Sequence, residues 1–261
     1  CRRRPVASAW FRVFVVPVVF VSVPLVSLSE PLSAQATIRG EAAALGVNAL
    51  LGGLTSGVGG WMRGGSFLES FGAGVLGGSI AFAGKRIAAS QATGAGLAGR
   101  FVGSVGASMV LNGSRAEGLF ETIVRPVGPL NVYRIGGAGE ARWTARLNVG
   151  RTIYLGRMLL RSDRELLWGE TLSAGAPVFV ARDTVLIGDS GDGIGGFEVL
   201  GTISITDPNR MGELDPAQVL AHERVHILQD DFVNITWAGP LEGWLLGLVG
   251  GEEISRYVEL G

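Results

Sequence analysis

The chain has 261 residues, of which 47% are hydrophobic and 17% charged, so it can bury a core in one or two domains. Its formal net charge of −1 argues against a nucleic-acid or polyanion partner, which would favour a strongly basic surface. The only cysteine is Cys1, so no intrachain disulfide holds the fold together.

The first 36 residues have the pattern of a secretory signal peptide. An arginine-rich start precedes an apolar run over residues 13–26, and Ala34-Gln35-Ala36 matches a small-residue cleavage site. We therefore expect cleavage after Ala36 and export to a periplasmic or membrane-associated location, as in a diderm bacterium. The alternative is an N-terminal membrane anchor that is retained.

Residues 37–113 form a glycine- and alanine-rich region with three stretches of helical length. These stretches are Ala44–Met62, Phe67–Ala89 and Gly94–Leu111. Small residues recur four apart within them, a spacing that lets membrane helices approach closely. Two interpretations stay open: helices that associate with a membrane over residues 44–111, and tightly packed helices of a water-soluble or membrane-peripheral domain.

The sequence pattern of residues 114–208 indicates a β-rich region. Ala141–Val149 alternates apolar and polar residues, which predicts a half-buried strand. We expect an antiparallel sheet or small barrel over Leu119–Ile205. Further strands are expected at Leu130–Ile135, Arg151–Leu155, Pro177–Ala181, Thr184–Ile187 and Glu198–Ile205.

The loop DSGDGIGG, which begins at Asp189, carries two acidic residues among glycines. A calcium site is one interpretation, but no bidentate glutamate follows at EF-hand spacing. The turn chemistry favours a hairpin loop instead.

Residues 209–261 begin with signals for a helix. Asp215 suits the N-cap and Pro216 the first helical position. No glycine or proline occurs from Ala217 to Gln229, so we expect one uninterrupted helix over this stretch.

The only two histidines of the chain lie on this expected helix. They are His222 and His226, and Glu223 follows the first directly, which gives the pattern H-E-x-x-H. Residues four apart share a helix face, so both imidazoles can reach one ion. Glu223 is rotated from His222 by about 100°, which keeps its carboxylate beside the metal. The pattern predicts zinc bound by both histidines, with Glu223 as general base on a zinc-bound water. The alternative is a histidine pair beside a glutamate that forms ordinary helix ion pairs.

The sequence AHERVHILQ resembles the active-site helix of the zincin metallopeptidases. With Gln229, it is more narrowly similar to the H-E-x-x-H-x-x-Q helices of uncharacterised secreted or membrane-associated bacterial proteins with peptidase assignments. The resemblance is confined to this helix. It implies a zinc metallopeptidase with a peptide or protein substrate, in which His222 and His226 bind zinc and Glu223 is the base.

A zinc site of this kind requires a third protein ligand, and the chain has no third histidine. In the gluzincin arrangement, the third ligand is a glutamate on a following helix. Glu252 is the preferred candidate and Glu253 the next, because both open the segment EEISRYVEL after Gly250-Gly251. Glu242, Glu259 and a residue beyond the end of the chain are the alternatives. The competing role of acidic residues at a helix start is to complement the helix dipole.

Together these patterns predict an α+β fold: small-residue helices, an antiparallel β-rich middle, the H-E-x-x-H helix and a following helix. The expected function is zinc-dependent peptide hydrolysis outside the cytoplasm, with an extended substrate paired to an edge strand of the β region. The competing classes are a non-catalytic membrane-associated structural protein and a zinc-binding module without turnover.

Overall fold

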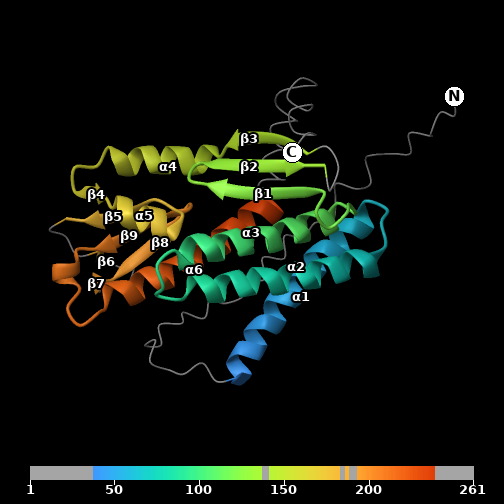
Figure 1. The fold of residues 1–261 in the computed structure, drawn as a ribbon, viewed down its shortest axis with the longest axis horizontal. Coiled ribbons are helices and arrows are strands. Elements are labelled where there is room, and N and C mark those ends of the chain that lie inside the picture. Colours follow the sequence, from blue (N-terminus) through green and yellow to red (C-terminus); the bar gives the residue numbers. More distant parts are fainter. Residues whose placement is uncertain (1–37, 137–140, 183–185, 188–192, 239–261) are drawn as a thin grey trace. The chain divides into compact units, whose positions relative to one another are not determined.

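The glycine-rich region forms three long helices in the computed structural model, which describes residues 38–136, 141–182, 186–187 and 193–238 (Figure 1). They are α1 (Ile38–Met62), α2 (Phe67–Ala88) and α3 (Ala95–Ser114). The three predicted helical stretches are thus confirmed. The expected signal peptide lies outside the described residues.

Glycine lets these helices pack with their backbones in contact. A β-carbon at Gly52 of α1 would lie 2.3 Å from the carbonyl oxygen of Gly74 in α2. A β-carbon at Gly84 of α2 would lie 2.5 Å from the backbone nitrogen of Gly103 in α3. No larger residue fits at such distances, so the recurrent small residues are explained by close helix packing.

The β-rich middle begins with a three-stranded antiparallel sheet. Its strands are β1 (Thr122–Val127), β2 (Leu130–Ile135) and β3 (Arg142–Leu147), paired in that order. The prediction for β2 is confirmed to the residue. β3 ends earlier than predicted because Asn148 is the N-cap of the next helix.

A second, mixed sheet follows in the chain. Its strands are β4 (Arg164–Leu166), β5 (Val178–Ala181), β8 (Gly196–Val199) and β9 (Thr202–Thr206), in the order β4-β5-β9-β8. β5 and β9 are parallel, unlike the wholly antiparallel arrangement expected from the sequence. The connection between them carries the short antiparallel pair β6 (Leu186–Ile187) and β7 (Gly193–Ile194), as a hairpin loop requires. Residues 188–192, the core of the acidic loop, lie outside the described residues.

Two predicted strands are wrong. Residues 151–155 lie within helix α4 (Val149–Leu159), which begins where the Asn148 side chain accepts the backbone N–H of Arg151. The expected strand Glu198–Ile205 is two strands, because the chain reverses at Leu200 and Gly201, both with positive φ. The short helix α5 (Trp168–Ala174) was not predicted.

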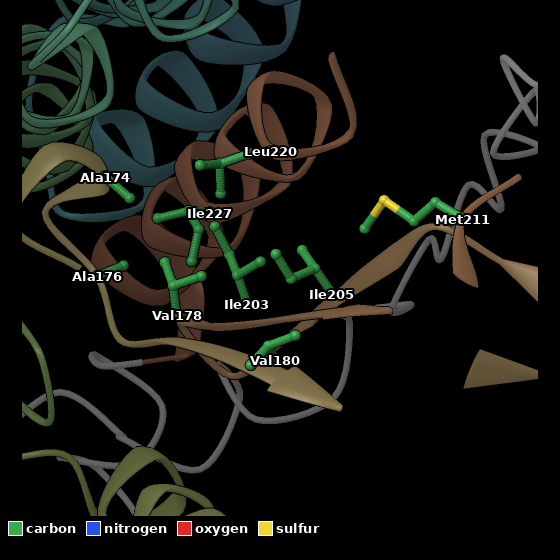
Figure 2. Close-up of a cluster of buried hydrophobic side chains, with 9 residues drawn as sticks. All are labelled: Ala174, Ala176, Val178, Val180, Ile203, Ile205, Met211, Leu220 and Ile227. Carbon is green, nitrogen blue, oxygen red and sulfur yellow. The ribbon is translucent and has the colours of Figure 1, made fainter. Parts of the chain in front are cut away.

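The main core lies between the mixed sheet and helix α6 (Pro216–Val233) (Figure 2). Two short helical turns flank α6: the 3-10 turn η2 (Pro208–Arg210) before it and the π-helical turn η3 (Asn234–Ala238) after it. The described residues from Ile38 onward belong to one compact unit, and the predicted α+β class is confirmed. The core cluster comprises Ala174, Ala176, Val178, Val180, Ile203, Ile205, Met211, Leu220 and Ile227.

Candidate metal centre

Helix α6 carries the H-E-x-x-H motif, as predicted. Its N-cap is Asp215, whose Oδ1 accepts the backbone N–H of Ala217 at 3.0 Å, and Pro216 takes the first helical position. Ile227 faces the mixed sheet, whereas Leu228 packs on α3. Two buried sides fix the rotation of α6 about its axis, and this rotation places the histidines on a half-buried side.

The two imidazoles converge. The Nε2 atoms of His222 and His226 are 3.0 Å apart, and the rings meet edge to face at 81°. Two nitrogens that share a tetrahedral zinc at about 2.0–2.1 Å lie roughly 3.3 Å from each other, so the observed pair is close to the separation that zinc requires. Burial, followed by the neighbouring His226, lowers the pKa of His222 and favours the neutral form that binds metals.

Gln229 holds the second imidazole from the other side of the ring. The Oε1 atom of Gln229 lies 2.9 Å from Nδ1 of His226, so an Nδ1–H tautomer donates to this oxygen. That tautomer leaves the Nε2 lone pair free to coordinate a cation. Gln229 thus has a physical role beside the two candidate ligands.

Glu223 lies under the edge strand β8. Glu223 is 5% exposed, and its Oε2 atom makes no hydrogen bond within the part of the chain that the structure describes. A β-carbon at Gly196 of β8 would lie 3.3 Å from Glu223 Cγ, so the strand passes directly over this side chain. Burial, together with the charge of Glu198, raises the pKa of Glu223 to about 7. A carboxyl group with this pKa is protonated in part of the molecules at neutral pH.

A second carboxyl group beside α6, the half-buried Glu198, was not identified from the sequence. Glu198 is two residues after Gly196 on β8, so both point to the face that packs on α6. Its Oε1 accepts the backbone N–H of Gly201 at 2.6 Å. Burial, followed by the charge of Asp230, raises its pKa to about 7. Only the pairing of β8 with β9 brings Glu198 to α6, and the sequence contains no local signal for that pairing.

Two aspartates after the motif fix the C-terminal half of α6. Asp231 accepts from Arg100 of α3 at 2.5 and 3.0 Å and from Arg151 of α4 at 2.7 Å. Asp230 pairs with the same Arg151 at 2.6 Å. Burial alone would raise the pKa of Asp231, but the two guanidinium groups outweigh it and lower the pKa. These carboxylates anchor the helix.

The predicted third ligands, Glu252 and Glu253, lie outside the described residues, as do Glu242 and Glu259. Among the residues that are described, no group of three His, Cys, Asp or Glu side chains is arranged to hold a metal. The described part of the chain therefore provides two nitrogen donors and a neighbouring carboxyl group.

Comparison of the chain with known protein families, curated proteins and solved structures found no match.

Proposed function

We propose that this protein is a zinc-dependent metallopeptidase that acts outside the cytoplasm. The observation that supports this proposal is the convergence of the His222 and His226 Nε2 atoms at 3.0 Å beside the buried carboxyl group of Glu223. An ordinary pair of helix histidines does not require a nearly unexposed glutamate with an oxygen that lacks a partner among the described residues.

The residues take separate roles in this proposal. His222 and His226 hold zinc, and Gln229 keeps His226 in the binding tautomer. Bound zinc would supply a Lewis acid that polarises the scissile carbonyl group. Glu223 takes the proton from the attacking water and delivers it to the leaving amine. Glu252 or Glu253 completes the ligand set, with Glu242 and Glu259 as the alternatives.

Strand β8 gives the proposed peptide substrate a place to bind. β8 is one of the two edge strands of the mixed sheet, so the backbone groups on its outer side are not used by that sheet. An extended peptide that pairs with this edge would lie next to Gly196, the residue directly over Glu223.

Replacement of Glu223 by Gln tests catalysis separately from metal binding. The side chain keeps its size but loses the base, so zinc content should remain while hydrolysis of a peptide library falls roughly a hundredfold or more. His222→Ala should lose zinc and activity together. Glu213→Gln, on the loop before α6, is the control and should change neither. Wild-type protein that stays free of zinc after zinc addition and mild dialysis would refute the proposal.

The third ligand is tested with Glu252→Gln and Glu253→Gln. The variant that removes the ligand should lose zinc along with activity, and the other should change little. If both keep zinc, Glu242 or Glu259 becomes the candidate.

Two non-enzymatic functions are the alternatives. A zinc-binding module would keep zinc but show no hydrolysis that depends on Glu223. A membrane-associated structural protein would bind no zinc. The two apolar helices α1 and α2 are compatible with a membrane location, and export through the expected signal peptide belongs to the same proposal.

A further inference from the structure

Helices α1 and α2 expose their large apolar side chains and bury small ones, which is the reverse of what a surface in water requires. In α2, the fully buried positions are all small, and in α1 the side that packs on α2 carries glycine and serine. The large apolar side chains point outward, including Leu50 at 52%, Leu54 at 44% and Trp61 at 66% exposure. Water-soluble helices bury large apolar residues and expose polar ones. The buried residues of α2 are Ser70, Gly74, Gly77, Gly78, Ala81, Gly84 and Ala88.

The outward side of α1 also lacks polar side chains. From Ala42 to Trp61, every exposed residue is Ala, Gly, Val, Leu or Trp. A protein–protein interface has about one hydrogen bond per 100–200 Å², which this surface cannot supply from its side chains except through the indole of Trp61. A surface in contact with acyl chains requires no hydrogen bonds from its side chains. The surface therefore fits lipid better than a second copy of the chain.

Charged groups lie at both ends of this surface. Glu41 of α1 pairs with Arg86 of α2 at 2.6 Å at one end, and Arg63 and Glu69 lie at the other. Between them, the 22 residues from Glu41 to Met62 extend about 33 Å at 1.5 Å per residue. By length and composition alone, α1 and α2 are both able to cross a bilayer.

The packing of α3 argues against crossing. One side of α3 contacts α2, whereas the other is covered along its length by the rest of the unit. Gly96 packs against α5, and Arg100 pairs with Asp231 of α6. The hydroxyl group of Ser108 accepts a hydrogen bond from the backbone N–H of Val124 in β1. The β-rich part therefore lies alongside the α1–α2 hairpin and not beyond its end. If the hairpin crossed a bilayer, this part would enter the hydrocarbon together with charged residues such as Arg142, which is exposed.

We propose that the α1–α2 hairpin lies in the plane of a phospholipid bilayer, with its outer side among the acyl chains and the rest of the unit on the aqueous side. Helices in this position are embedded about 5–10 Å deep. An isolated interfacial helix turns a charged face toward water. In this hairpin, the side away from the lipid packs against α3 instead. Trp61, which is exposed on the outer side of α1, suits the boundary between headgroups and chains at which an in-plane helix lies. The inference is independent of zinc and hydrolysis, so its failure would leave the metallopeptidase proposal untouched.

A site-specific fluorescent probe tests contact with lipid. In the full chain with Cys1→Ser, an environment-sensitive dye is attached at Leu54→Cys, and at Leu172→Cys as the control. Leu172 is 72% exposed on α5, which is not part of the hairpin. On addition of phosphatidylcholine/phosphatidylglycerol vesicles, the Leu54 probe should shift to shorter wavelength and be quenched several-fold more by nitroxide lipids than the control. A Leu54 probe that stays in water, or one that is shielded without vesicles as protein concentration rises, would overturn the proposal; the second result would indicate self-association.

Accessibility from one side separates an in-plane hairpin from a spanning one. Ser66 and Gln91 lie at opposite ends of α2, and both are exposed. In the same Cys1→Ser background, Ser66→Cys and Gln91→Cys proteins are bound to preformed vesicles and treated with a membrane-impermeant maleimide. We expect both positions to be labelled from outside. Protection of one position until the vesicles are lysed would show that α2 crosses the bilayer and would overturn the in-plane arrangement.

Discussion

Gln229 extends the motif by a residue that contacts His226, one of the two proposed zinc ligands. Its Oε1 atom, 2.9 Å from Nδ1 of His226, holds the imidazole in the orientation that aims Nε2 at Nε2 of His222. Loss of such a partner typically lowers metal affinity tenfold to a hundredfold. We expect Gln229→Ala to weaken zinc binding by about tenfold or more, as measured by competition with a chelating dye.

Gln218→Ala is the matched control for this measurement, because Gln218 is also exposed on α6 but is on its first turn. Equal zinc affinity of wild type and Gln229→Ala would mean that the contact does not orient His226.

The sequence is sufficient to predict the local part of the site. His222, Glu223 and His226 lie within five residues, and helix geometry alone brings the imidazoles together. Glu198 and Gly196 are different, because they reach Glu223 through a strand pairing that local sequence does not specify. Their contribution becomes visible only when β8 is placed over α6.

At the scale of elements, α6 is held by a buried charge cluster that joins three helices. Asp231 of α6 pairs with Arg100 of α3 and Arg151 of α4, and Asp231 is 3% exposed. Removal of one partner leaves a buried charge without compensation, which typically costs about 3–5 kcal/mol. We expect Asp231→Asn to lower the free energy of unfolding by an amount of this order, measured by urea denaturation.

Asp163→Asn serves as the comparison, because Asp163 pairs with Arg161 on an exposed surface, where an ion pair adds little. An equal loss in the free energy of unfolding for the two variants would mean that burial does not increase the contribution of the Asp231 cluster to stability.

The same cluster explains why one element was mispredicted. Residues 151–155 were expected to form a strand, but Asn148 caps a helix there and Arg151 turns inward to the aspartates of α6. The local sequence does not distinguish a buried arginine from an exposed one, because its partners are distant in the chain. The helices α1 to α3 were predictable because their length and glycine spacing are themselves local.

At the scale of the whole molecule, the half-buried Glu198 links stability to pH. Its carboxyl group has a pKa of about 7 in the folded protein, against the usual 4.5. Between these values the folded state keeps a proton that the unfolded state has released, so folding loses stability as pH rises from about 4.5 to above 7. Glu223 contributes with the same sign in metal-free protein. The pKa of Asp231 is lowered from 3.8, so its titration lies below this range.

Glu198→Gln removes the titrating group while its amide oxygen can still accept the backbone N–H of Gly201. We therefore expect the free energy of unfolding of Glu198→Gln, relative to wild type, to increase between pH 5 and pH 8 in protein treated with a chelator. Urea denaturation at both pH values measures the two differences. Val199→Thr, on the same strand but without an ionisable group, should show the same difference from wild type at both pH values. A difference between Glu198→Gln and wild type that does not change with pH would mean that burial against α6 does not hold the proton on Glu198.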